Sequence, residues 1–175
     1  LGRFIHAAIR LGGAIEMITH SALVNHGGGL SKRGEVVWAQ PVQHAHALYG
    51  TMSGVRPVAV EVSSRKYSAA EPRIPRAENA PEVDAVALLD GTGEELTIIA
   101  INTNPTEEVT AVVQIDDPKA RPVRARRVEG PSYMTRNSAS SPAAAALRRI
   151  EPPAVGQGRF RFPPHSITEV VFGLK

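Results

Sequence analysis

The chain has 175 residues, of which 42% are hydrophobic, so it can supply the core of one domain, or of a domain with a small additional piece. It has no cysteine, which excludes disulfides and thiolate metal sites and suits a reducing compartment, so we expect a cytoplasmic protein. No apolar run approaches the roughly 20 residues of a membrane-spanning helix, and no signal peptide precedes the first predicted helix, so we expect no membrane partner.

The net charge is +3 and the sequence pI is about 9.6, with most of the basic residues being arginine. The densest basic group consists of Arg121, Arg124, Arg126 and Arg127. A nucleic-acid-binding stripe would carry aromatic residues or a recognition motif among these arginines, and the sequence has neither there. We therefore interpret the group as the solvated face of a strand and expect no nucleic-acid partner.

The first 20 residues predict a helix followed by a strand. Apolar residues recur at helical spacing between Phe4 and Leu11. Two glycines interrupt this pattern, and residues 14–20 begin as a short apolar run that is typical of a buried parallel strand. Residues 19–30 then turn polar and contain three consecutive glycines, which predicts the carboxyl end of the strand and a long loop.

A second helix is predicted from Pro41 to Gly54, because proline is favoured near the start of a helix and glycine just past its end. The order of helix, strand, loop and helix is one repeat of an alternating α/β architecture. In such architectures the carboxyl end of the strand and the loop after it carry the chemistry.

From residue 55 onward the sequence becomes strand-like. Residues 55–62 contain a β-branched run, whereas residues 64–82 hold three prolines and many charges and predict a surface excursion or linker. Residues 83–90 and 96–102 flank Gly91-Thr92-Gly93, which predicts a hairpin with a short glycine-containing turn.

Further short strands separated by turns follow the hairpin. We expect strands at residues 109–115, 123–128, 160–162 and 166–172, and one loose helical turn at residues 143–147. In the last strand Ile167, Val170 and Phe172 would all face inward if a one-residue bulge is present. The whole pattern predicts a mainly β chain, with an antiparallel β-sandwich over residues 55–175 and an α/β piece over residues 1–54.

An ordered series of segments covers nearly the whole chain and resembles one known family. The segments are residues 19–30, the proline-initiated helix that ends in Leu48-Tyr49, residues 58–62, residues 96–102 and residues 162–168. The series looks like the carboxyl-terminal part of an α-L-arabinofuranosidase of glycoside hydrolase family 51. The resemblance implies a (β/α)8 barrel followed by a β-sandwich. Residues 1–54 would be a remnant of the barrel, comprising its seventh helix (1–12), eighth strand (14–20) and eighth helix (41–54), and residues 55–175 would be the sandwich.

The resemblance also implies what the protein does. Members of the family remove terminal non-reducing α-L-arabinofuranosyl groups from arabinan- or arabinoxylan-type saccharides with retention, using two glutamates on the fourth and seventh barrel strands. Both glutamates would lie before residue 1, so this chain would contain no catalytic residue and would be inactive alone. Its partners would be the missing amino-terminal part of the barrel, an arabinofuranosyl-containing saccharide and other copies of itself, since the family commonly forms homo-oligomers.

The acids of the chain agree with that expectation. A retaining glycosidase needs two carboxyl groups roughly 5 to 5.5 Å apart, one protonated and one ionised. Glu16 lies inside the predicted barrel strand, four residues before its carboxyl end, and Glu35 lies in the loop. These two residues do not form the required pair, and the sequence predicts no cofactor.

The candidate substrate-binding residues are His20, Ser21, Asn25 and His26, which would lie where the eighth strand opens onto the active-site face. Their imidazole, hydroxyl and amide groups are suitable hydrogen-bond partners for sugar hydroxyls. Many family members have a sugar-contacting Gln at the position that here is Ala22, so that contact is lost, supplied by water, or taken over by a neighbour such as His20 or Ser21. For His20 and Asn25 the alternative is a side chain that hydrogen-bonds the loop backbone.

Other functions are less well supported by the sequence. The three glycines lack the following Lys and Ser/Thr of a phosphate-binding loop, and His44 and His46 are two apart, so we predict no metal site. The main alternative is a non-catalytic carbohydrate-binding module, which should present a platform of exposed aromatic residues. The sandwich has only Tyr67, Tyr133, Phe160, Phe162 and Phe172, most of them at core-like positions.

Overall fold

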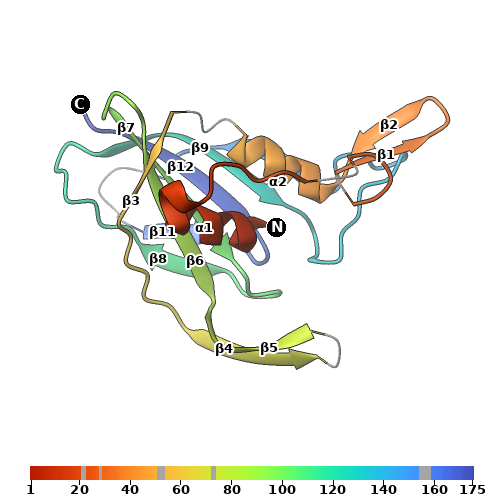
Figure 1. The fold of residues 1–175 in the computed structure, drawn as a ribbon, viewed down its shortest axis with the longest axis horizontal. Coiled ribbons are helices and arrows are strands. Elements are labelled where there is room, and N and C mark those ends of the chain that lie inside the picture. The colour runs from red at the N-terminus through yellow and green to blue at the C-terminus, as the bar shows by residue number, and fades with distance from the viewer. Residues whose placement is uncertain (21–22, 28, 51–53, 72–73, 154–158) are drawn as a thin grey trace.

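The computed structural model describes residues 1–20, 23–27, 29–50, 54–71, 74–153 and 159–175. Two helices pack on one face of a six-stranded antiparallel sheet, and a small second sheet packs on its other face (Figure 1). The antiparallel β-sandwich predicted from the sequence is therefore confirmed.

The helices are α1 (Gly2–Leu11), which leads into a 3-10 turn (Gly12–Ala14), and α2 (Pro41–Tyr49). The large sheet has the strand order β10-β9-β12-β7-β6-β3. In that order its strands are Ala146–Ile150, Arg121–Glu129, Ile167–Gly173, Glu95–Asn102, Val83–Leu89 and Arg56–Val58. The second sheet pairs β11 (Arg159–Phe162) with β8 (Val109–Val112).

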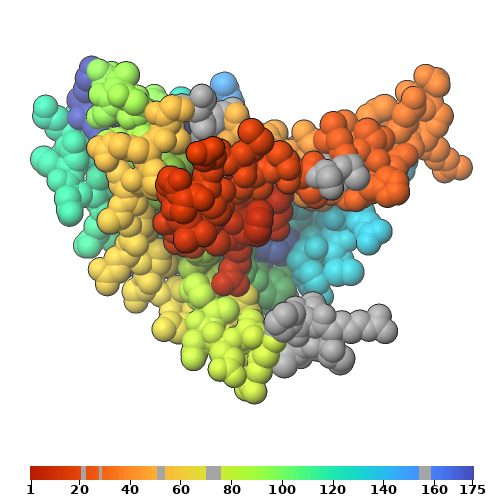
Figure 2. All heavy atoms as spheres, in the orientation of Figure 1, coloured from red at the N-terminus to blue at the C-terminus, as the bar shows by residue number. Residues whose placement is uncertain are grey.

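Two hairpins extend from this body. One consists of β1 (Leu30–Arg33) and β2 (Val36–Ala39), and the other of β4 (Lys66–Glu71) and β5 (Ile74–Pro81). The β1–β2 hairpin projects at the right of the molecule in Figure 2. It lies between the segment after α1 and the start of α2.

The large sheet is buried on both faces because its strands alternate between two cores. One core lies between the two sheets, where the rings of Phe160 and Phe172 are 5.9 Å apart. The other lies under the helices and is centred on Leu48 and Ile99, both fully buried. Burial of both faces explains why all of the residues from 168 to 172 are buried, with no alternation between exposed and buried positions.

That double burial corrects the expectation for the last strand. Val170 and Phe172 face the second sheet, whereas Ile167 faces the helices, so the three residues do not share a face. A register shift does occur, between Val171 and Phe172 against β9. It is not needed to bury the apolar residues, because β12 has a hydrophobic core on either side.

The expected strand at residues 14–20 is wrong. Residues 12–14 form a 3-10 turn and residues 15–20 have no regular structure and are exposed. A parallel strand needs neighbouring strands for its backbone N–H and C=O groups, and no described strand pairs with this segment. The apolar run therefore stays unpaired beside α1.

Three further expectations are corrected. Residues 64–82 do form a surface excursion, but it contains the unpredicted β4–β5 hairpin, where prolines are tolerated because each strand has a free edge. The helical turn expected at residues 143–147 is absent, because residues 143–145 form a turn and a bend and residues 146–147 begin β10, where pairing with β9 overrides the helix propensity of the alanine run. The helix α2 ends at Tyr49, before Gly54.

The other predicted elements are confirmed. The first helix and the hairpin of β6 and β7 lie where the sequence places them. The turn of that hairpin is closed by Asp90, whose carboxylate accepts hydrogen bonds from the backbone of Glu94 and Glu95 at 2.8 and 2.9 Å. Neither described helix is long and apolar enough to cross a membrane.

The core under the helices yields a stability prediction. Leu48→Ala should lower the free energy of unfolding by about 2–5 kcal/mol, because the side chain is fully buried and its removal leaves a cavity. The matched control is Leu11→Ala, on α1, where the leucine is 60% exposed and a change within about 0.5 kcal/mol is expected. Urea unfolding of this chain followed by circular dichroism measures both, and equal effects would contradict the assigned core.

Candidate functional site

The loop that carries the predicted substrate-binding residues is bonded to β1 through Asn25. Asn25 has a left-handed backbone, with φ at 62°, and its Oδ1 accepts the N–H of Lys32 at 2.8 Å. Its Nδ2 also donates to the Lys32 carbonyl at 3.3 Å. Asn25 thus ties the loop to β1, which is the backbone-fixing role weighed from the sequence.

His20 contacts helix α2. Its Nδ1 lies 2.7 Å from Nε2 of His46, and both rings are near the surface. In such a pair one nitrogen donates and the other accepts, so one imidazole is held by the other. Burial, and next the charge of His20, lower the pKa of His46. The contact with His46 orients the ring of His20, which remains exposed.

The remaining predicted residues are less constrained. His26 is exposed, and Ser21 and the neighbouring Ala22 lie outside the described residues. Within the part of the chain that the structure describes, no hydrogen bond joins His20, Asn25 and His26 to one another. The structure therefore places these residues on one loop without assembling them into a closed pocket.

Asn137 joins this region to the sandwich. Nothing in the sequence marks it as a site residue except its place at the start of a serine-rich stretch. It is only 4% exposed, and its backbone and side chain bond to both sides of the junction. Its Nδ2 donates to the carbonyls of Ala39 and Ala145 at 2.8 Å, and its Oδ1 accepts the N–H of Ala145 at 2.9 Å. Its carbonyl accepts from the Trp38 indole at 3.0 Å and from Gln40 Nε2 at 2.9 Å.

A buried polar cluster lies between α1, α2 and β6. His6 is fully buried, and its Nδ1 donates to Asp84 at 3.0 Å while its Nε2 lies 2.8 Å from the hydroxyl of Tyr49. Arg10 also pairs with Asp84 and donates to the carbonyl of Ala85 at 2.8 Å. One carboxylate thus connects both helices with the sheet.

The electrostatics of this cluster keep Asp84 ionised. Burial alone would raise the pKa of Asp84, but the hydrogen bonds from His6 and Arg10 outweigh burial and lower the pKa. Burial, and next the Asp84 charge, raise the pKa of Tyr49, so its hydroxyl remains a donor. The cluster resembles a proton relay in its order of groups, but it is enclosed by the two helices and the sheet.

A second buried pair lies under α2. Glu169 on β12 is 2% exposed and pairs with Arg126 on β9, whose Nε lies 3.1 Å from Oε2. Arg126 Nη2 also donates to the carbonyl of Leu48 at 3.2 Å. The expectation that the arginines of this region form a solvated face is therefore wrong for Arg126, which is part of the helix–sheet interface.

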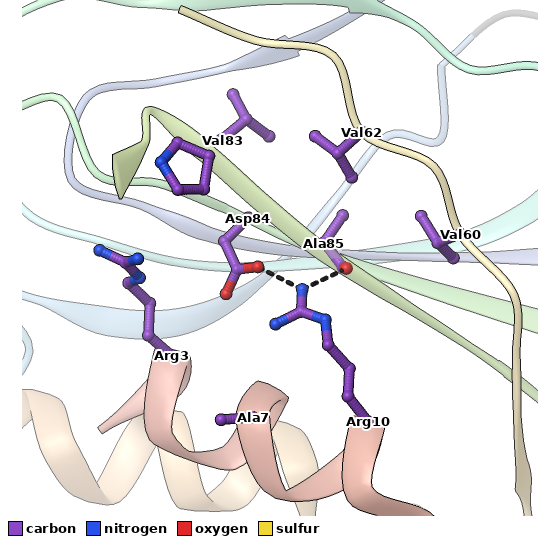
Figure 3. Close-up of a pocket in the computed structure, with 9 residues that line it drawn as sticks. Arg3, Ala7, Arg10, Val60, Val62, Val83, Asp84 and Ala85 are labelled. Atoms are coloured by element: carbon purple, nitrogen blue, oxygen red, sulfur yellow. Dashed lines mark hydrogen bonds and ion pairs between the residues drawn. The ribbon is translucent and has the colours of Figure 1, made fainter. Parts of the chain in front are cut away.

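A cavity of about 380 Å³ opens where β3 separates from β6. Arg3, Ala7 and Arg10 of α1 line one side, and Val60 and Val62 line the other (Figure 3). Arg10 reaches across it to Asp84 and the Ala85 carbonyl. Because Arg10 and Asp84 are already engaged in the interface between α1 and β6, and Arg3 bonds the Tyr67 hydroxyl at 3.3 Å, we assign the cavity a structural role.

The chain does not assemble a glycosidase centre from its own loop acids. Glu16 and Glu35 are both exposed, Glu16 in the segment after α1 and Glu35 in the turn of the β1–β2 hairpin. Among the described residues, no group of three or more His, Asp or Glu side chains is arranged to hold a metal ion.

The aromatic residues of the sandwich differ in exposure. Phe160, Phe162 and Phe172 are buried, whereas Tyr67 and Tyr133 are exposed.

These features define a class of fold, an antiparallel β-sandwich whose larger sheet is covered by two helices from a preceding segment. Known glycoside hydrolases share it. The chain resembles the α-L-arabinofuranosidase from Thermotoga maritima, with 24% identity over 88% of this chain and 33% of that chain, and a TM-score of 0.77. It also resembles a family 51 α-L-arabinofuranosidase from Bifidobacterium longum, with 16% identity over 98% of this chain and 32% of that chain, and a TM-score of 0.79. The family 51 α-L-arabinofuranosidase from Thermotoga petrophila has 25% identity over 86% of this chain and 32% of that chain, and a TM-score of 0.71.

The resemblance predicted from the sequence is confirmed in the fold, which is that of a part of glycoside hydrolase family 51 α-L-arabinofuranosidases. The chain spans about a third of the length of the structures that it matches. No protein-family model matches the sequence, and no curated protein matches it.

The buried carboxylate yields a pH prediction. Because the pKa of folded Asp84 lies below its usual value of 3.8, ionised Asp84 stabilises the fold above that pH, and the stabilisation is lost as the pH falls through the lower folded value. Asp84→Asn should cost about 1–3 kcal/mol near pH 7, since it removes the charged partner of buried His6 and of half-exposed Arg10. The difference in unfolding free energy from wild type should shrink below about pH 4.

The control for this titration is Glu78→Gln on β5, an exposed position where a change within about 0.5 kcal/mol is expected. Urea unfolding at a series of pH values measures both variants. A difference between wild type and Asp84→Asn that stays constant from pH 7 to pH 3 would contradict the role given to the Asp84 charge.

Proposed function

We propose that this chain is the carboxyl-terminal part of a retaining α-L-arabinofuranosidase that removes terminal arabinofuranosyl groups from arabinose-containing saccharides. The observation that carries the proposal is the match in fold, which covers most of this chain but only about a third of each family 51 enzyme. The proposal includes the cytoplasmic location expected from the absence of cysteine. It also includes the homo-oligomer that the resemblance implies.

In this proposal residues 1–54 belong to the barrel and residues 55–175 form the sandwich. The apolar exposure of the first segment supports the division. Phe4, Leu11, Met17 and Leu23 are all more than half exposed, although large apolar side chains are normally covered. The rest of the barrel would bury these residues, so it is the partner that the proposal assigns to this surface.

The chemistry of retention places the reacting carboxylates outside this chain. One carboxyl group must protonate the leaving oxygen while the other attacks the anomeric carbon, at a separation of roughly 5 to 5.5 Å. Glu16 and Glu35 are exposed on separate elements and make no such pair. The nucleophile and the acid/base would therefore come from the missing part of the barrel.

The contribution of this chain to the site would be the positioning of the substrate. His20, held by His46, would present an imidazole to a sugar hydroxyl, and Ser21 and His26 are further candidates on the same loop. Asn25 would act on the loop and not on the sugar, because both of its amide atoms are used by Lys32. The buried ties to the sandwich would keep α2, and hence His46, in place.

The first test is the release of arabinose from p-nitrophenyl α-L-arabinofuranoside by the intact reading frame that contains this chain and by this chain alone. We expect activity in the intact protein and none in the chain, because the reacting carboxylates would be missing from it. If the chain alone cleaves the substrate, the assignment of the carboxylates is wrong. If neither protein cleaves it, the proposed activity is wrong and the likeness is one of fold.

A second test addresses His20 in the intact protein. His20→Ala should lower kcat/KM for the same substrate by roughly 3- to 10-fold, which corresponds to the loss of one hydrogen bond to the sugar. His46→Ala should have a smaller effect, since it removes only the ring that holds His20. Glu78→Gln on the distant β5 strand serves as the control, and a His20 variant with unchanged kinetics would contradict the role of this residue.

A further inference from the structure

The loop between β9 and β10 reaches the same region as the β1–β2 hairpin, although it belongs to the sandwich. We call residues 130–145 the Tyr133 loop. In Figure 1 it lies beside β1 and β2, and in Figure 2 its atoms lie next to those of the segment that follows α1. The hydrogen bonds of Asn137 to Ala39, Trp38 and Gln40 hold it there.

The Tyr133 loop is shaped by its own hydrogen bonds. Thr135 N–H donates to the Ser132 carbonyl at 3.0 Å, and Ser132 N–H donates to Thr135 Oγ1 at 3.0 Å, which closes a turn around Tyr133 and Met134. Ser138 and Ser141 close a second turn through paired backbone bonds of 3.1 Å. The exposed side chains at the first turn are therefore presented by an ordered backbone, which lowers the entropy cost of binding.

The composition of the Tyr133 loop suits a neutral, hydroxyl-rich ligand. The loop has no Asp, Glu or Lys, a single Arg, and five Ser or Thr residues. Tyr133 and Met134 are 66% and 69% exposed, although both are large side chains. An exposed aromatic ring on a loop rich in hydroxyl groups suits a sugar ring, which offers C–H groups on its face and hydroxyls at its edge.

The position of the Tyr133 loop follows from the proposed function, on which this inference rests. Under that proposal residues 21–40 connect the last barrel strand to the last barrel helix. Such connections lie on the active-site face of a (β/α)8 barrel. A sandwich loop bonded to the end of this connection, at Ala39 and Gln40, therefore lies at the rim of that face.

We propose that Tyr133 binds the saccharide on the leaving-group side, contacting the sugar next to the arabinofuranosyl unit that is removed. The sandwich then supplies a specificity-determining contact to the substrate in addition to supporting the barrel. Tyr133 gives the ring face and Met134 an adjoining apolar surface, while the serines and threonines offer hydroxyls. The contact acts only on substrates whose leaving group carries a sugar.

The test uses the intact protein and two substrates that differ in the leaving group. One is an arabinose-substituted xylo-oligosaccharide, and the other is methyl α-L-arabinofuranoside, whose leaving group has no ring. Tyr133→Ala should lower kcat/KM for the oligosaccharide by about 5- to 10-fold, mainly through KM, as expected for one lost ring contact. It should leave kcat/KM for the methyl glycoside within about twofold of wild type.

Two variants serve as controls. Tyr133→Phe keeps the ring and should retain most of the activity on the oligosaccharide. Tyr67→Ala removes the other exposed tyrosine, on the β4–β5 hairpin, and should leave both substrates unaffected. Circular dichroism and thermal unfolding confirm that each variant is folded.

The outcomes are distinguishable. If wild type cleaves both substrates and Tyr133→Ala changes neither, or lowers both equally, this inference is overturned and the proposed function stands. If Tyr133→Ala alters only the oligomeric state, the loop is a protein interface and the inference is again overturned. If wild type releases arabinose from neither substrate, the proposed function is wrong, and this inference, which rests on it, is wrong as well.

Discussion

The position of the helices depends on two carboxylates that are buried beneath them. Removal of an ionised carboxylate from water costs several kcal/mol unless a charged partner accompanies it, so Asp84 and Glu169 determine what must pack above the sheet. Asp84 receives His6 and Arg10 from α1, and Glu169 receives Arg126, which also donates to the last turn of α2 at Leu48. The apolar contacts around Leu48 and Ile99 supply the buried area, while the charges fix the orientation of each helix. Displacement of α1 would leave Asp84 without His6 and Arg10, and displacement of α2 would break the hydrogen bond from Arg126 to the Leu48 carbonyl.

The ties at the two ends of α2 have different chemistry. At its end, Arg126 makes a charged contact from the sheet, and at its start Asn137 makes neutral contacts from a loop. Asn137 offers both an amide donor and an amide acceptor, and these match the free backbone groups of Ala39 and Ala145. Because α2 is held at both ends, the residues that precede it and the His46 side chain have fixed positions relative to the sandwich. The loop at residues 130–145 and the segment that ends at Gln40 are thereby held together.

The sequence predicts those parts of the fold that local chemistry determines. The β6–β7 hairpin follows from two strand-like runs around a glycine-containing turn, and α2 follows from Pro41 and its helical pattern. The predicted strand at residues 14–20 fails because strand formation requires partners that no local pattern can supply. The strand β10 is missed because the run of alanines that leads into it favours a helix in isolation. The predicted site loop was found through its change from apolar to polar residues. Asn137 could not be found in this way, because its function arises from contacts with residues almost 100 positions away.

The helix α1 shows how incomplete burial and function are connected. Its Ile5, His6 and Ile9 pack toward the sheet, while Phe4 and Leu11 point away from that contact and are largely exposed. A helix with apolar residues on both sides is typical of a layer that is covered from two directions. The sheet provides one cover, and under the proposed function the remaining barrel provides the other. The same argument explains why the loop residues of this chain do not form a closed pocket. Under the proposed function they would line one side of a site whose reacting carboxylates and opposite wall come from the rest of the barrel.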